Sequence, residues 1–221
     1  MVLKKRITFV ILLLGGIIIM GLTSLTACGL NKDSREWIEQ NRVSDIYKVY
    51  PTKNPKDLFK VFPDGFGIRQ SYTGKDGVTY ELNVEGDPNT KEIKGDLVRD
   101  PIDDAQKVSD VRVEDSHLVF SDPSVKQYWP TDEFLFQHLA INQAYLDKLK
   151  STDHGYNSQS GSFNIAYQLS DSAINKFLNL KDEEIEKFEI SGWGKEYRQR
   201  TIKLNFTQRV EFFEGINKII E

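Results

Sequence analysis

The chain has 221 residues, with 29 lysines and arginines against 33 aspartates and glutamates, and a net charge of −4. This acidic balance argues against nucleic acid as a partner, because neutralising a phosphate backbone requires a basic surface. The single cysteine, Cys28, excludes a disulfide within one molecule.

The first residues have the pattern of an export signal. Lys4, Lys5 and Arg6 precede an apolar run over residues 7–22, and no acidic residue occurs before Asp33. A membrane-spanning helix needs roughly 20 apolar residues, so this run of about 16 is short for an uncleaved anchor. The sequence therefore favours a cleaved leader.

The cleavage site predicts a lipoprotein. Leu25-Thr26-Ala27-Cys28 resembles a lipobox, in which an aliphatic and two small residues precede a cysteine that is alkylated with diacylglycerol. An ordinary secretory site would require a small residue where Leu25 stands. We expect a cleaved signal over residues 1–27, a lipidated tether over residues 28–33, and lipid on Cys28. That lipid would hold the chain on the outer face of the cell membrane. The alternative is that Cys28 merely ends a signal.

Residues 34–221 are long enough for one domain, which begins with helical patterns. One helical face is formed by apolar residues three and four positions apart, followed by Pro51: Val43, Ile46, Tyr47 and Tyr50. Asn54-Pro55 can start a second short helix that ends at Pro63. Without the three basic residues of the leader, 26 basic residues face 33 acidic ones, a net charge of −7.

The middle of the chain alternates between strand and helix patterns. Residues 78–85 alternate apolar and polar side chains, residues 93–98 can form the next strand, and residues 111–120 can form a hairpin around Asp115-Ser116. Residues 134–149 then carry apolar side chains at helical spacing, which predicts a helix lying across the sheet.

Strand patterns return towards the end of the chain. Residues 163–169 alternate, residues 171–180 can form a short helix, and residues 201–207 give the clearest strand, with Ile202, Leu204 and Phe206 on one face. These elements predict an α+β fold: an antiparallel, meander-type, curved sheet with a helix packed across it and N-terminal helices.

Motifs for catalysis or metal binding are absent from the sequence. His117, His138 and His154 lack ligand-spaced neighbours, and the serine-rich segment 158–162 does not form the nucleophile elbow of a serine hydrolase. The acidic segments match no calcium loop. We therefore expect no catalytic residues, no metal and no cofactor, and a protein that is not an enzyme. Two carboxylates that converge in a cleft would revive an enzymatic reading.

One local basic stretch stands out in this acidic chain. It consists of Tyr197, Arg198, Arg200, Lys203 and Arg209, and we treat it as a candidate interaction patch. Solvated faces of two strands would explain it equally well. Trp37, Trp129 and Trp193 fall at helix starts or turns, where exposure would indicate a binding surface.

Several segments, in order, are similar to the staphylococcal tandem-type lipoproteins, the conserved staphylococcal antigen family. They are residues 50–58, 89–95, 166–170, 191–192 and 202–206. The resemblance implies an α+β surface lipoprotein without known enzymatic activity, implicated in host-cell contact and innate immune stimulation. It supplies no catalytic residues, so only Cys28 is named as a site. Family members are typically basic, whereas this mature chain is acidic.

Two functions remain open from the sequence. The first is a membrane-anchored surface lipoprotein that acts by binding or contact with a protein partner. The alternative is a carrier that encloses an apolar or lipid ligand between the sheet and the 134–149 helix. An elongated apolar pocket there would favour the carrier, and a filled core would favour contact.

Overall fold

The computed structural model describes residues 31–102, 104–181, 183–194 and 197–219. The expected leader, with Cys28, lies outside the described residues. The helical segments are α2 (Arg35–Ile38), η1 (Glu39–Val43), η2 (Ser44–Lys48), η3 (Pro55–Asp57), α3 (Leu58–Val61), η4 (Pro123–Gln127), α4 (Leu135–His138), α5 (Gln143–Leu146), α6 (Ser172–Phe177) and η5 (Thr207–Arg209). The strands are β1 (Phe66–Thr73), β2 (Thr79–Gly86), β3 (Ile93–Arg99), β4 (Gln106–Glu114), β5 (His117–Phe120), β6 (Lys150–Tyr156), β7 (Phe163–Gln168), β8 (Ile185–Trp193), β9 (Gln199–Phe206) and β10 (Glu211–Lys218).

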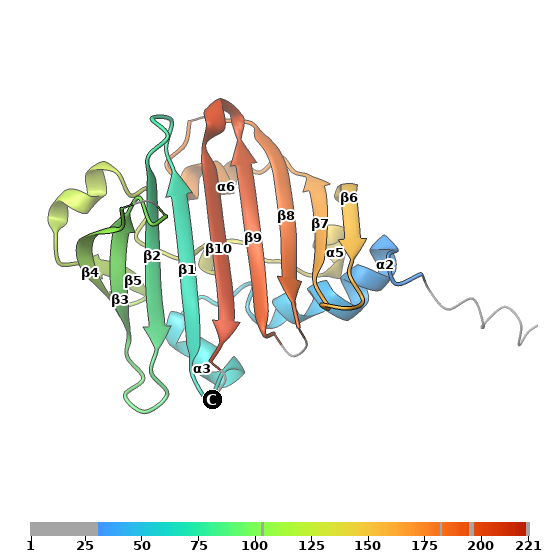
Figure 1. Cartoon of the computed structure of the whole chain (residues 1–221), viewed down its shortest axis with the longest axis horizontal. Helices are drawn as coiled ribbons and strands as arrows, with labels where there is room; N and C mark the ends of the chain where they lie inside the picture. Colours follow the sequence, from blue (N-terminus) through green and yellow to red (C-terminus); the bar gives the residue numbers. More distant parts are fainter. Residues whose placement is uncertain (1–30, 103, 182, 195–196, 220–221) are drawn as a thin grey trace, which may run out of the picture.

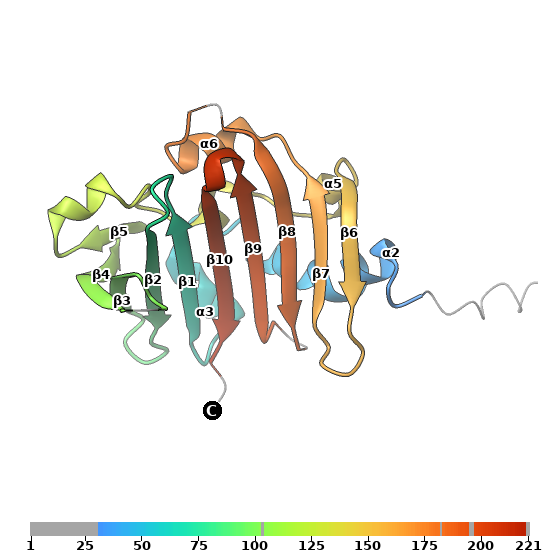
Figure 2. The ribbon, with the colours of Figure 1, turned by 45° about the horizontal axis from the view of Figure 1, so that its top comes forward.

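These strands form one antiparallel sheet in the order β5-β4-β3-β2-β1-β10-β9-β8-β7-β6, shown face-on in Figure 1. The sheet consists of two five-stranded meanders that meet at β1 and β10, which pair from Phe66 and Lys218 to Thr73 and Glu211. The first strand, β1, lies at the centre of the sheet; the following strands lead out to β5, residues 121–149 cross to β6, and the remaining strands lead back to the centre (Figure 2). The two edges of the sheet are therefore β5 and β6.

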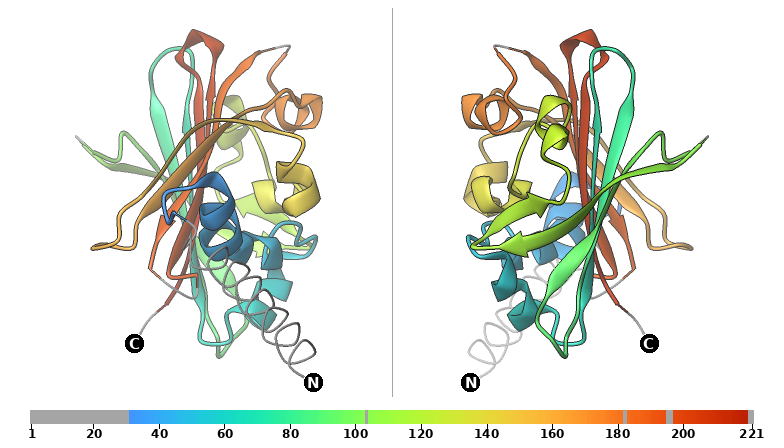
Figure 3. Two further views of the ribbon diagram at one scale, coloured as in Figure 1. Left: turned by 90° about the vertical axis from the view of Figure 1, so that its right-hand side faces the viewer. Right: turned by 90° about the vertical axis from the view of Figure 1, so that its left-hand side faces the viewer.

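The helices cover one face of the sheet, as the two side views in Figure 3 show. On this inner face, alternate side chains of the central strands are almost fully buried, among them Ile68, Leu82, Leu204 and Phe212. On the outer face, polar side chains such as Lys203 keep contact with solvent, because successive strand residues point to opposite faces. None of the helices in the described part of the chain is long and apolar enough to cross a membrane.

The expected α+β class is wrong, because the fold is largely β with a few short helices. The helix expected over residues 134–149 is broken into α4 and α5, each of four residues. Between them Leu139 has extended backbone angles of −97° and 121°. Its apolar side chains still pack inwards: Leu135, Leu139 and Leu146 are at most 4% exposed. The periodic apolar pattern therefore reflects side chains buried by two short helices and the extended segment between them, and not one continuous helix.

Four strands were not expected from the sequence: β1, β6, β8 and β10. In β1 and β10 the polar residues Gln70 and Glu214 occupy inward positions and are 0% exposed, which conceals the alternation of apolar side chains. Strand β6 is a polar edge strand with little apolar content. The predictions for β9 and the β4–β5 hairpin are confirmed. Ile202, Leu204 and Phe206 are at most 1% exposed, and Asp115 and Ser116 form the turn with positive φ angles of 46° and 69°.

Candidate functional site at the β5 edge

The structure separates the members of the predicted basic patch. Tyr197 and Arg200 are buried, at 4% and 2% exposure, and face inwards. Lys203 lies on the outer face in an ion pair of 2.9 Å with Glu211. Arg209 belongs to the η5 turn at the far end of β9. The five residues therefore do not form one surface, and a partner for the exposed members stays a prediction.

Arg200 is a buried structural residue, which its position in a basic stretch of the sequence did not indicate. Its Nη2 lies 2.7 Å from Oδ2 of Asp45, and its guanidinium also donates to the carbonyl oxygens of Arg42, Trp193 and Gln199. Burial lowers the pKa of Arg200, and the nearby Asp45 carboxylate opposes that shift. This arginine ties the N-terminal helical segment to β9.

Of the three tryptophans, Trp193 is exposed, at 39%, and Arg198 stacks above it with 4.3 Å between the guanidinium carbon and the ring centroid. They line a recess of about 500 Å³ on the outer face together with Phe213 and Ile219. Trp129 is only 4% exposed, and Trp37 is partly buried against the core. Exposure thus singles out Trp193, as expected of a residue at a binding surface.

A second recess, of about 600 Å³, lies at the β5 edge of the sheet. Its walls are β5 on one side and the loop 122–132 on the other. Apolar lining comes from Leu118, Phe120, Val125 and Trp129, while Asp122, Lys126 and Asp132 supply charge. We refer to it as the β5 recess. Its volume falls within the range of roughly 300–1,000 Å³ that is common for ligand sites.

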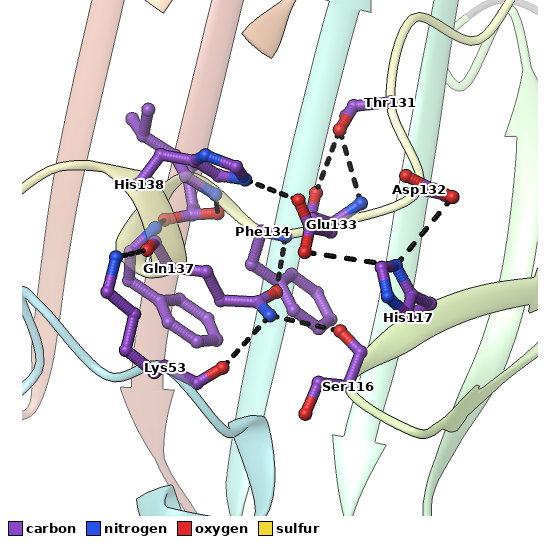
Figure 4. A network of polar contacts seen from close by, with 12 residues as sticks. Lys53, Ser116, His117, Thr131, Asp132, Glu133, Phe134, Gln137 and His138 are labelled. Atoms are coloured by element: carbon purple, nitrogen blue, oxygen red, sulfur yellow. Dashed lines mark hydrogen bonds and ion pairs between the residues drawn. The ribbon is translucent and has the colours of Figure 1, made fainter. Parts of the chain in front are cut away.

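The polar side of the β5 recess is a network centred on Glu133 (Figure 4). One carboxylate oxygen of Glu133 lies 2.6 Å from Nε2 of His138, and the other lies 3.8 Å from Nδ1 of His117. His117 is also 3.7 Å from Asp132, and the Thr131 hydroxyl accepts a hydrogen bond of 3.1 Å from the Glu133 amide. Residues from β5, the loop and α4 are thereby brought together.

Gln137 fixes this network to the rest of the fold (Figure 4). Its side-chain oxygen accepts a 2.8 Å hydrogen bond from the Phe134 amide. Its side-chain nitrogen donates to the carbonyl oxygens of Ser116, at 3.0 Å, and Lys53, at 3.2 Å. Gln137 is 4% exposed. One buried amide therefore joins the β4–β5 turn, the segment after η2 and α4.

Beneath this layer, Glu214 of β10 holds the start of α4 against the sheet. It is 0% exposed and accepts four hydrogen bonds, from Tyr50 at 2.6 Å, Gln70 at 2.7 Å, Leu135 N at 2.7 Å and Phe136 N at 3.0 Å. Burial raises the pKa of Glu214 to about 7, and these hydrogen bonds oppose the shift. Sequence reasoning missed it because a glutamate at an inward strand position gives no signal of its partners.

The arrangement shows no metal centre in the part of the chain that the structure describes, where no three His, Cys, Asp or Glu side chains are grouped to hold an ion. The Glu133 network is partly exposed, with side-chain exposures of 50% for His117 and 27% for Glu133. Its chemistry suits hydrogen bonding and attraction of a cation to the carboxylates.

No protein-family model and no curated protein matches the chain. Among solved structures, the chain is similar to the Mycobacterium tuberculosis lipoprotein LppX, with a TM-score of 0.42 and 11% sequence identity. The match covers 75% of this chain and 92% of that one. Membership of the staphylococcal tandem-type family is not supported by these matches and stays a prediction.

The space between residues 134–149 and the strands is where a carrier would hold its ligand, so its filling bears on the two functions left open by the sequence. At its centre the backbone amides of Leu135 and Phe136 donate hydrogen bonds of 2.7 and 3.0 Å to the Glu214 carboxylate of β10. Phe134, Phe136 and Phe212 are 0% exposed and pack there, with the first two rings stacked at 5.0 Å. The centre of the sheet is therefore filled by the chain's own side chains.

Proposed function

We propose that this chain is a lipid-anchored surface protein that acts by contact with a partner protein, without catalysis. The anchor is the diacylglyceryl group on Cys28, as Leu25-Thr26-Ala27-Cys28 indicates. Two acyl chains bind a membrane stably, at about 0.8 kcal/mol per buried CH₂, whereas one chain binds reversibly. The finer role in host-cell contact and immune stimulation rests on the staphylococcal resemblance alone.

The observation that carries the proposal is where the tether joins the fold. Oδ1 of Asp33 accepts a 2.8 Å hydrogen bond from the amide of Tyr156, the last residue of β6. Asp33 is the fifth residue after Cys28, and an extended chain spans at most about 3.5 Å per residue, roughly 17 Å for these five steps. With lipid on Cys28, the β6 edge would be the part of the sheet nearest the membrane.

The opposite edge is then the part best placed to meet a partner. Nine strand spacings of about 4.8 Å separate β6 from β5, so the β5 recess lies roughly 40 Å from the tethered edge along the sheet. A carrier would need an enclosed apolar space over the inner face. The direct bonds from Glu214 to α4 occupy its centre, which favours contact.

Replacing Cys28 with alanine tests the anchor. We expect unprocessed precursor and no diacylglyceryl incorporation, measured by metabolic labelling with a lipid precursor and by the mass of the N-terminal peptide. A Ser24→Ala variant, upstream of the four lipobox residues, serves as the control and is expected to be processed normally. Lipid labelling of the Cys28→Ala chain at the wild-type level would refute the anchor.

A further inference from the structure

The β5 recess contains a buried donor that the fold leaves without a partner. Trp129 lines the recess and is 4% exposed, and its indole Nε1, a hydrogen-bond donor shielded from solvent, has no hydrogen-bond partner among the described residues. Most buried polar groups in folded proteins are hydrogen-bonded, so an orphan donor calls for an explanation. An acceptor supplied by a ligand in the recess would provide one.

A second donor lies on the same wall. Leu118 of β5 directs its amide away from β4, because it donates to the Asp132 carbonyl oxygen at 2.6 Å. Strand amides alternate in direction, so the Phe120 amide, two residues further on, points the same way. Strand pairing between β4 and β5 is regular through Phe120. Within the described chain, the Phe120 amide donates no hydrogen bond. The edge strand thus offers a backbone donor next to the recess.

The charges around the recess favour a cation. The recess is lined by the carboxylates of Asp122 and Asp132 and by the ammonium group of Lys126, and the Glu133 carboxylate lies 3.8 Å from the His117 ring. The Asp132 side chain is 63% exposed, and its ion contact is with His117 at 3.7 Å. Apolar lining from Phe120, Val125 and Trp129 lies beside these carboxylates, which matches a long basic side chain with an apolar stem.

We propose that the β5 recess binds a short extended segment of a partner protein in which a lysine or arginine lies next to an apolar residue. A backbone carbonyl of the segment accepts from the Trp129 indole, and another accepts from the Phe120 amide in the manner of an added strand. The apolar residue enters the recess, and the basic side chain lies towards Asp132. This inference rests on the proposed contact function and assigns it a site and a partner chemistry.

Selection from a random seven-residue phage-displayed peptide library, with the mature chain immobilised through a C-terminal tag, tests the inference. We expect enriched peptides that pair a basic with an apolar residue. Synthetic copies should bind Trp129→Phe about tenfold more weakly, because this change keeps an aromatic ring and removes the donor. Asp132→Lys should lose the preference for basic peptides. Circular dichroism melts verify that both variants fold.

Matched controls separate the site from general effects. Trp193→Phe removes an indole donor on the outer face, and Asp153→Lys reverses a charge on β6 at the other edge. Both should bind the selected peptides as the wild type does. Failure to enrich any peptide would overturn the inference, as would equal binding by wild type, Trp129→Phe and Asp132→Lys. Neither result bears on the anchor, which the Cys28→Ala labelling tests separately.

Discussion

The Tyr50 hydroxyl donates a 2.6 Å hydrogen bond to the Glu214 carboxylate, and the two residues are 164 positions apart in the chain. Both are buried, and the same carboxylate accepts from the α4 backbone. The bond therefore joins the N-terminal segment, the last strand and the crossover in one cluster. A second buried glutamate, Glu39, joins α5 and β7 in the same manner, with Tyr167 at 2.8 Å and Gln143 at 2.9 Å.

Glu214 should make the stability of the domain depend on pH. Burial raises its pKa from 4.5 to about 7, so between these values the folded chain holds a proton that the unfolded chain has released. The contribution is fully present below about pH 4.5 and is lost as pH rises through about 7. The expected slope is about −1.4 kcal/mol of unfolding free energy per pH unit in this window.

Urea unfolding at pH 5, 6, 7 and 8 measures this slope. Glu214→Gln has no titrating group at the position, so the difference between the two chains isolates Glu214 from the exposed carboxylates. We expect the wild type to lose stability relative to Glu214→Gln as the pH rises. Parallel pH profiles for the two chains would show that the carboxylate does not titrate there.

The register of β9 predicts opposite effects for two nearby residues. Phe206 is 1% exposed, and Phe206→Ala should cost about 3–5 kcal/mol, as truncation of a buried aromatic does. Lys203 is 38% exposed in a surface ion pair, and Lys203→Ala should change the unfolding free energy by less than about 1 kcal/mol. Thermal melts compare them. The reverse order would mean that the strand faces are exchanged.

The ion pair between Asp45 and the buried Arg200 should contribute to the unfolding free energy of the domain. Removing one partner of a buried ion pair typically costs about 3–5 kcal/mol, and Asp45→Ala should fall near 3 because Arg200 keeps several carbonyl acceptors. Lys48→Ala is the matched control, since its ion pair with Asp45 spans 3.7 Å at the surface. Chemical denaturation measures both. Equal, small losses would contradict a stabilising role for the pair.

The sequence predicted the elements whose apolar pattern is uninterrupted. Strand β9 and the β4–β5 hairpin follow directly from alternation and from the Asp115-Ser116 turn. Strands β1 and β10 escaped prediction because their inward positions include Gln70 and Glu214, whose partners lie far away in the chain. The local sequence pattern cannot identify a buried polar residue whose hydrogen-bond partners are distant in the chain. Because strands were therefore missed, the predicted fold class was α+β instead of largely β.

The candidate site was less predictable than the fold. The basic stretch around Arg200 suggested a surface because charged residues are rarely buried, yet five backbone and side-chain acceptors surround that guanidinium. In the sequence His117 and His138 are 21 positions apart and appear isolated. In the folded chain the Glu133 carboxylate contacts both imidazole rings. The sequence shows Trp129 only as a tryptophan at a helix start or turn. Its orphan indole is visible only once the loop 122–132 is folded against β5.

Native mass spectrometry of the mature chain, extracted gently from membranes, tests most directly whether the protein acts by contact or by carrying a ligand. The filled centre of the sheet predicts the polypeptide mass plus covalent lipid on Cys28, with no further molecule released on collisional activation. A second lipid, bound noncovalently at one per chain and lost on activation, would contradict the contact account and establish a carrier.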